Sequence, residues 1–429
     1  MINYNIIREI LRTQVKPALG CTEPAAVALA VARAKEILGM DVESLHITVN
    51  KNILKNGLSV GIPGTKDVGL DFAAALSLCI GKSEYGLEVF KDVTDQSVLD
   101  AKEILEKNII KTQLDKSLNS LYIGVEAKSG DNISQVIIKE AHTNIVFESL
   151  NDDIILDKDI HEESDTLIKL DNKEIKYRIM DYDIDDLIAY VNKEDINELD
   201  FIQDGISMNL TLAEVGFNVD LGIGISKHYK KNIINTSTKA KAYTVSASEA
   251  RMSGYPLPVM SSAGSGNHGL VAIIPISVIG KDKEYSDEQI IRSVALSHLI
   301  TIFVKVQIGA LSPVCGCGVA AGVGSAAGMT YLQGGNNSEI KASINNMIAG
   351  VSGMFCDGAK IGCAYKLSIS VDAALDASGM ALADIEIPSD NGILGDSAEE
   401  SIANLALVSN IGMINTDAVI LDIMMHECP

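Results

Sequence analysis

Tryptophan is absent from this 429-residue sequence, and the aromatic residues together make up only 4%. So few rings argue against a surface that stacks on bases or sugars. Basic residues are also scarce, because 35 Lys and Arg face 57 Asp and Glu and leave a formal net charge of −22. A field of that sign repels phosphate backbones, so nucleic acid is not an expected partner.

Long hydrophobic runs are missing as well. The longest ones, such as residues 270–279, are interrupted well before the ~20 residues that a membrane-spanning helix needs. The first residues show no basic segment followed by an apolar one, so no signal peptide is expected. With 47% hydrophobic and 21% charged residues, the chain has the composition of a folded globular protein. We therefore expect a cytoplasmic protein with no membrane contact.

The seven cysteines are the most informative residues that the sequence does have. Without an export signal, they are expected to be free thiols or metal ligands rather than a disulfide framework. Four of them fall in a single short window of the chain: Cys315, Cys317, Cys356 and Cys363. The remaining three are Cys21, Cys79 and Cys428, of which Cys79 lies on an apolar helical face and is expected in the core.

The distribution of residue types along the sequence predicts an α+β protein in three parts. Residues 1–40 form an N-terminal helical segment, with helices over 5–15 and 25–38, the second capped by Thr22 with Pro24 in its first turn. Residues 41–204 form an α+β domain. Residues 205–429, rich in Ala, Gly, Ser and Ile, form a mostly helical catalytic domain in which small residues let helices approach closely.

Particular elements follow from the spacing of apolar residues. In the α+β part, alternating patterns predict strands over 45–49, 121–127, 134–141 and 167–179, with helices over 67–81 and 96–111. In the last part, helices are expected over 236–252, 286–307, 316–332, 337–354, 365–380 and 397–412. The glycines Gly322, Gly324 and Gly328 do not have the spacing of a dinucleotide-binding loop and are interpreted as helix-packing residues.

Two glycine-containing turns carry the clustered cysteines, PVCGCG at 313–318 and CDGAKIGC at 356–363. Thiolates in such turns can converge on a metal. The spacing is neither that of a zinc ribbon nor that of a ferredoxin. Soft thiolate ligands select zinc, copper(I) or an iron–sulfur cluster, and the alternative is that these cysteines are simply small buried apolar residues.

Four motifs in order, GCTEP at 20–24, MSSAGSGNHG at 260–269, PVCGCGVAAG at 313–322 and CDGAKIGC at 356–363, make the chain resemble the L-cysteine desulfidase family. That family is related to the catalytic alpha subunit of iron–sulfur L-serine dehydratases. The resemblance covers nearly the whole chain. It implies β-elimination of L-cysteine to pyruvate, ammonia and hydrogen sulfide, with the dehydration of L-serine as the alternative.

The resemblance also implies roles for single residues. A [4Fe–4S] cluster would be bound by Cys356, Cys363 and one cysteine of the CGC motif, with Cys315 preferred over its rival Cys317. Cys21 matches the position of the proton acceptor, and it stands beside a predicted helix N-terminus that favours a thiolate. The last two cluster cysteines of the serine dehydratases are separated by more residues than here, which favours the desulfidase branch.

β-Elimination requires a base for the α-proton and groups that bind the amino acid. The loop 261–269 offers hydroxyls, an amide and an imidazole, so Ser265 and Asn267 are predicted to bind substrate and His268 to transfer a proton. Lys360, between two cluster cysteines, is predicted to hold the substrate carboxylate. Asn52 and the neighbouring Lys51 are weaker candidates for entering the site.

Other interpretations stay open at this stage. The chain is also compatible with a non-catalytic protein whose thiols bind zinc or sense redox state, or with a cluster-dependent hydro-lyase acting on a hydroxy acid. The small-residue helices are compatible with a homodimer. Cys428 would reach the fourth iron only if the C-terminal tail folds back, and a frayed tail is the simpler interpretation.

Overall fold

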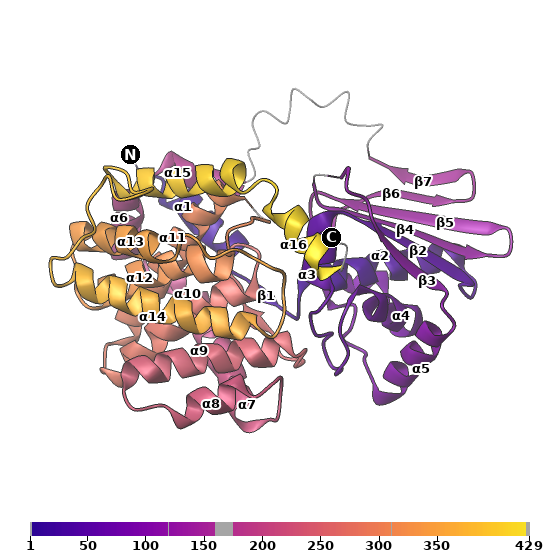
Figure 1. Cartoon of the computed structure of the whole chain (residues 1–429), viewed down its shortest axis with the longest axis horizontal. Coiled ribbons are helices and arrows are strands. Elements are labelled where there is room, and N and C mark those ends of the chain that lie inside the picture. The colour runs from indigo at the N-terminus through magenta and orange to yellow at the C-terminus, as the bar shows by residue number, and fades with distance from the viewer. Residues whose placement is uncertain (1, 119, 159–174, 310, 426–429) are drawn as a thin grey trace.

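The computed structural model describes residues 2–118, 120–158, 175–309 and 311–425, and these form a helical lobe and a lobe built on a β-sheet (Figure 1). The α+β class predicted from the sequence is confirmed. Cys428 and residues 159–174, which include part of the expected strand 167–179, lie outside the described residues. The division of the chain at residues 40 and 204 stays a prediction.

The sheet lobe contains six strands in the order β3-β2-β4-β5-β6-β7. Only β2 and β3 run parallel, and the other neighbours are antiparallel. The strands are β2 (Ser44–Val49), β3 (Ile110–Leu114), β4 (Tyr122–Ser129), β5 (Asn132–Lys139), β6 (Ile145–Leu150) and β7 (Asp153–Asp157). Their alternating burial gives one face to a core and one to solvent, as expected for antiparallel strands.

The core of the sheet lobe lies under the alanine-rich helix α2 (Thr22–Leu38), which packs across β4 and β5. Its small side chains permit this close approach, and the ion pair of Arg33 with Glu148 of β6 fixes α2 along the sheet at 2.8 Å. A second apolar cluster packs α2 against two further helices of this lobe, α4 (Leu70–Ile80) and α5 (Asp95–Glu106). The helices of this lobe are α2, α3 (Lys51–Gly57), α4 (Leu70–Ile80), α5 (Asp95–Glu106) and the 3-10 turn η1 (Ser83–Glu88).

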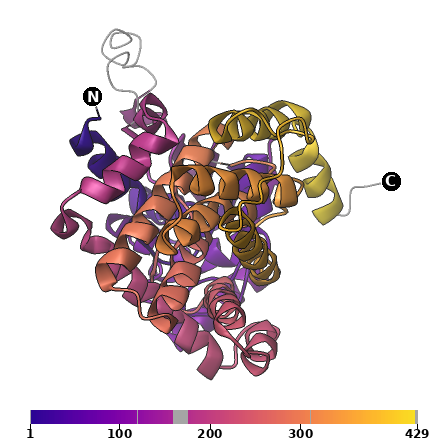
Figure 2. The same cartoon turned by 90° about the vertical axis from the view of Figure 1, so that its left-hand side faces the viewer.

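The helical lobe is arranged around two almost completely buried helices, α10 and α11, and Figure 2 views this lobe from its outer side. Its helices are α1 (Tyr4–Gln14), α6 (Ile184–Lys193), α7 (Phe201–Asn218), α8 (Ile225–Lys231), α9 (Thr236–Met252), α10 (Gly266–Asp282), α11 (Asp287–Ile308), α12 (Ala321–Leu332), α13 (Asn337–Val351), α14 (Cys363–Ala381) and α15 (Ala398–Leu407). Shorter turns are η2 (Ile175–Asp181), η3 (Ile196–Leu199), η4 (Gly316–Ala320) and η5 (Val408–Gly412).

Close helix packing in this lobe depends on glycine. A side chain at Gly324 would collide with Thr301 of α11, and one at Gly322 would collide with Met347 of α13. The interpretation of these glycines as packing residues is therefore confirmed. Helix α11 has the length and apolarity of a membrane span, but 83% of its most apolar window is buried inside the protein, as expected of a core helix.

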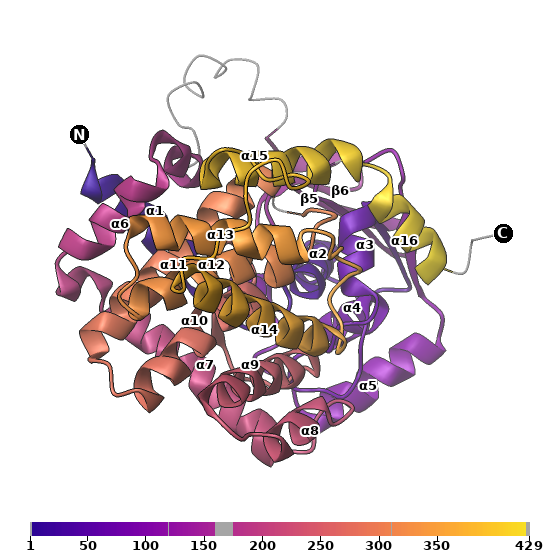
Figure 3. The same cartoon turned by 60° about the vertical axis from the view of Figure 1, so that its left-hand side comes forward.

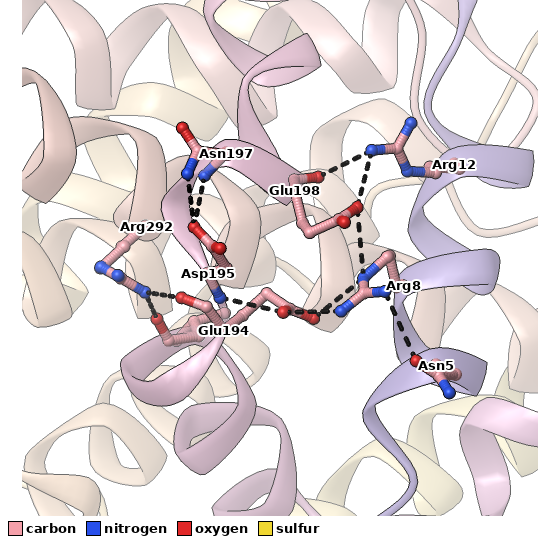
Figure 4. A network of polar contacts seen from close by, with 9 residues as sticks. Asn5, Arg8, Arg12, Glu194, Asp195, Asn197, Glu198 and Arg292 are labelled. Carbon is pink, nitrogen blue, oxygen red and sulfur yellow. Dashed lines mark hydrogen bonds and ion pairs between the residues drawn. The ribbon is translucent and has the colours of Figure 1, made fainter.

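The charged contacts of α1 attach the N-terminal segment to the helical lobe (Figure 4). The Arg8 guanidinium donates to both oxygens of the buried Glu194 carboxylate, at 2.9 and 3.2 Å, and this bidentate contact raises the pKa of Arg8. Arg292 of α11 donates to the backbone carbonyl of Glu194 at 3.0 Å. Three segments that are distant in sequence are thus joined at one point.

Two further contacts connect the lobes. Strand β1 (Pro17–Ala18), just before α2, pairs antiparallel with β8 (Val259–Met260), just before α10. Helix α16 (Thr416–Met424) leaves the helical lobe and packs on α3, as Figures 1 and 3 both show. Its residue Leu421 belongs to the apolar core under the sheet.

The structure corrects several sequence predictions. The cap of α2 is Cys21 and not Thr22, which already lies in the first turn. The helix expected over 96–111 ends at Glu106 because the chain turns there into β3. The described end of the expected strand 167–179 belongs to the 3-10 turn η2, which packs on α1 and α11 instead of pairing in the sheet.

Candidate functional site

A cavity of about 500 Å³ lies between the lobes, and most of the predicted site residues line it. Those that do are Cys21, Ser265, Asn267, His268, Cys317, Cys356 and Cys363. Cys315 and Lys360 are not among the lining residues. The walls also include side chains that the sequence did not single out: Glu23, Lys55, Asn56, His142, Arg251 and Lys305.

The two cysteine turns are held together by backbone pairing. The N–H of Cys315 donates to the carbonyl of Met354 at 2.8 Å, and the N–H of Cys356 donates to the carbonyl of Pro313 at 2.6 Å. Between them, Val314 and Phe355 form an antiparallel bridge. The convergence of the two turns predicted from their glycine content is therefore built into the backbone.

Within the first turn the two cysteines face each other. Their sulfurs are 3.5 Å apart, and the N–H of Gly318 donates to the sulfur of Cys315 at 3.4 Å. Cys317 lies on the cavity wall, whereas Cys315 lies behind it and is buried. The π-helical turn η4 that begins at Gly316 produces this arrangement, since an extra residue in the turn brings Cys317 to the front.

In the second turn, Cys356 leads into Gly358, whose φ is +89° and whose backbone lies directly against the carbonyl of Lys55. A side chain at position 358 would collide with that carbonyl. The thiol of Cys363, at the start of α14, donates to the carbonyl of Gly358 at 3.6 Å. The turn is thereby fixed against α3 of the sheet lobe.

The proximity and burial of the four thiols shift their pKa values. The hydrogen bond from Cys317 lowers the pKa of Cys315 to about 6, and the same bond raises the pKa of Cys317. Burial raises the pKa of Cys356, and it raises that of Cys363 to about 12. Without a bound cation, the protein would therefore keep only one of these four groups as a thiolate. A bound cation would deprotonate the others.

The four thiols are soft donors, of the kind that bind zinc, copper(I) or an iron–sulfur cluster. Among the described residues, no group of three or more His, Cys, Asp or Glu side chains is arranged so that it could hold a metal ion. An iron–sulfur cluster binds each thiolate on a different iron and spreads its ligands over a wider space. Four soft donors on two turns, three of them on the wall of one cavity, fit such a cluster.

Cys21 is the N-cap residue of α2 and lines the same cavity. It is buried, and it packs against Met252 and Cys363. The thiolate expected there is not what the surroundings favour. Burial raises the pKa of Cys21 to about 11, an effect that the charge of Arg251 opposes and that of Glu23 reinforces. Cys21 is therefore a thiol at neutral pH.

His268 lies in the first turn of α10, and its two ring nitrogens have different roles. Nδ1 is 3.0 Å from the carbonyl of Ser262, which only accepts, so Nδ1 carries the hydrogen and Nε2 carries the lone pair. Nε2 faces Gly316, where a side chain would collide with it. Burial lowers the pKa of His268 to about 3, and the imidazole is neutral at physiological pH.

The remaining predicted residues have more limited contacts. Ser265 caps α10 and lines the cavity, and Asn267 accepts a hydrogen bond from Arg251 at 3.2 Å. Lys360 pairs with Asp357 in its own turn. Lys51 does not line the cavity, but Asn52, its neighbour on α3, does.

Sequence reasoning missed three buried cations around the cavity. Lys305 donates to the carbonyl of Gly309 at 2.6 Å and to Ser312, and burial lowers its pKa to about 8. Lys55 pairs with Asp417 at 2.6 Å and donates to the carbonyl of Cys356 at 3.2 Å. The third is Arg251. For Lys305 a signal was available, because it is the lone charge in the apolar run Ile300–Val306.

Comparison with known proteins identifies the family of the chain. The profile of the family described as "Serine dehydratase alpha chain" matches residues 84–422, and the chain belongs to this family. It is also similar over its whole length to UPF0597 proteins. That of Caldanaerobacter subterraneus subsp. tengcongensis is 53% identical over 98% of both chains, and that of Clostridium tetani is 51% identical over 100% of both. The UPF0597 protein of Clostridioides difficile is 42% identical over 97% of this chain and 98% of its own.

Proposed function

We propose that the protein is an iron–sulfur-dependent lyase that eliminates hydrogen sulfide from L-cysteine and releases pyruvate and ammonia. Family membership supports amino-acid dehydratase or desulfidase chemistry. The observation that carries the proposal is the convergence of Cys317, Cys356 and Cys363 with Cys21 and His268 on one cavity. The chemistry is expected in the cytoplasm, on a small amino acid and with no nucleic acid or membrane partner.

The cluster would be held by Cys356, Cys363 and one of the paired cysteines Cys315 and Cys317. When bound, a cluster with one iron free of protein ligands supplies a Lewis acid that polarises the bond to the leaving group. Lys305 and Lys55 add positive charge near these thiolates. That positive charge would stabilise a cluster whose ligands are anionic.

Proton transfer is assigned to the pair Cys21 and His268. His268 has a free lone pair on Nε2 at neutral pH, but burial lowers its pKa to about 3, so in the protein alone it is a weak base. Cys21 is protonated and acts as an acceptor only after losing its own proton. Elimination moves the α-proton to a base and expels hydrosulfide, and the aminoacrylate left behind takes up water and gives pyruvate and ammonia.

The function is tested by anaerobic purification, iron reconstitution, and assay of pyruvate and sulfide from L-cysteine beside pyruvate from L-serine. A cluster-loaded protein that releases pyruvate and sulfide together is the expected result. Pyruvate from serine alone would move the assignment to the second candidate, L-serine dehydration, which the description of the matching family favours. A protein that binds stoichiometric zinc, takes up no iron and turns over neither amino acid would refute the proposal.

Two comparisons of variants then assign the residues. Iron content after reconstitution of Cys315→Ser and Cys317→Ser identifies the third ligand, because only the true ligand's loss should deplete iron. Exchange of the α-proton of L-alanine in D2O, measured for Cys21→Ser and His268→Asn, identifies the acceptor. Alanine has no leaving group, so its exchange reports proton transfer without elimination. The oligomeric state, which the small-residue helices leave compatible with a homodimer, is measured by light scattering.

A further inference from the structure

Arg251 is a buried cation without an anion. Only 6% of it is exposed, and among the described residues no carboxylate lies within ion-pair distance of its guanidinium. Its Nη2 donates to the carbonyl of Gly20 at 2.7 Å and its Nη1 to Asn267 at 3.2 Å, but its Nε is buried with no partner. A buried guanidinium in this state is costly, and an anion entering the cavity would relieve that cost.

The packing around Arg251 keeps the guanidinium in place. It lies close to Gly266 at the start of α10, where any side chain would collide with its Nε and Cζ atoms. Asn267, the next residue, fixes one nitrogen through its amide oxygen. The guanidinium is therefore positioned before any ligand arrives, which is what a planar carboxylate receptor requires.

Asn52, on the part of the cavity wall that α3 forms, has the complementary property. It is 7% exposed, and its side-chain oxygen is a buried acceptor with no donor. It lies one helical turn before Asn56 on α3, so both face the same way. Asn56 donates to the carboxylate of Glu23 at 2.9 Å, and Glu23 lines the same cavity. This wall thus offers a neutral oxygen and a carboxylate, the groups that an ammonium needs.

The start of α2 is hydrogen-bonded to both parts of the cavity wall. Arg251 holds the carbonyl of Gly20, and Asn56 holds the side chain of Glu23. Cys21 stands between the two contacts. We propose that Arg251 binds the carboxylate and Asn52, with Glu23, the ammonium of an α-amino-acid substrate, so that its α-carbon is held beside Cys21. The inference rests on the proposed function, because it names the groups that select an α-amino acid for the same site.

The experiment measures binding, by calorimetry under anaerobic conditions, of L-alanine, propanoate and ethylamine to the reconstituted full-length protein. Propanoate lacks the ammonium group and ethylamine lacks the carboxylate. Arg251→Gln should weaken alanine and propanoate by about 10- to 100-fold and leave ethylamine unchanged. Asn52→Ala should weaken alanine but not propanoate. Arg251→Lys should recover part of the lost affinity, and Arg12→Gln, at a surface arginine outside the cavity, should change nothing.

The pattern of affinities across the three ligands distinguishes a role of Arg251 in substrate recognition from a purely structural role. If Arg251 only fastens the Gly20 turn, Arg251→Gln will lower the melting temperature but leave the affinity for alanine intact, which overturns the inference. Failure of wild-type protein to bind alanine also overturns it. Alanine is not turned over, so its binding does not depend on the proposed reaction. If the expected pattern of affinities is found in a protein that turns over neither cysteine nor serine, the proposed reaction is refuted and amino-acid recognition is supported. Turnover without this pattern would refute the recognition alone.

Discussion

His298 is fully buried in α11, and burial lowers its pKa to about 3 from the ordinary value of 6.5. Its Nδ1 lies 2.9 Å from the hydroxyl of Ser262, the residue whose carbonyl accepts the hydrogen bond of His268. Between the two pKa values the unfolded chain binds a proton that the folded protein does not. The free energy of unfolding therefore falls as the pH drops below about 6.5, and it is restored as the pH rises.

The size of the effect follows from the two pKa values. Lowering the pH from 7 to 5 should remove about 2 kcal/mol of stability through His298 alone. Replacement by Asn, which does not titrate and can still bond to Ser262, should abolish this component. The measurement is urea unfolding of the wild type and His298→Asn at both pH values, comparing how much each loses. Other groups titrate equally in both proteins and cancel in the difference.

His228 provides the matched control, because it is exposed on α8. His228→Asn should lose as much stability on acidification as the wild type does. If His298→Asn also loses as much as the wild type, within ~0.5 kcal/mol, the buried neutral imidazole is not the source of the pH dependence. The reasoning about His298 would then be wrong.

Further predictions concern the contacts that position the site. Lys55→Met should lower the free energy of unfolding by about 3–5 kcal/mol, because Asp417 is left buried and unpaired, and adding Asp417→Leu should recover most of it in urea unfolding. Glu249→Gln should cost about 1–3 kcal/mol in the same assay, since its buried carboxylate accepts four backbone N–H groups of residues 223–226. Gly358→Ala should displace Cys356 from its turn and lower iron content after reconstitution, whereas Gly392→Ala, with a positive φ but open space around it, should retain iron.

The sequence predicted much of the fold because many of its signals are local. The helix expected over 236–252 is α9 with the same bounds, and the strand expected over 45–49 forms nearly all of β2. Helix α16 was missed because it is short, and what stabilises it is contact with α3, more than 300 residues away. The hairpin of β6 and β7 was missed because its acidic residues resemble a solvated surface loop.

The site was predictable to a similar extent. Glycine turns with cysteines were enough to bring the two motifs together, but not to show that the π-helical turn places Cys317 in front of Cys315. Nothing along the chain marks Arg251, whose neighbours are Ala, Met and Ser. Its role depends on Gly20, 231 residues away. The pKa of Cys21 was misjudged because the N-terminus of a helix was considered without its burial.

The pairing of Lys55 with Asp417 joins positions 362 residues apart. A ribosome adding 5–20 residues each second needs on the order of 20 to 70 s to make the second residue after the first. During that time the sheet lobe has no α16 to complete its core, and the turn at Cys356, once made, rests against an uncompensated Lys55. Iron delivered before residue 417 emerges would meet an unfinished site. Maturation of the protein is therefore expected to follow translation rather than accompany it.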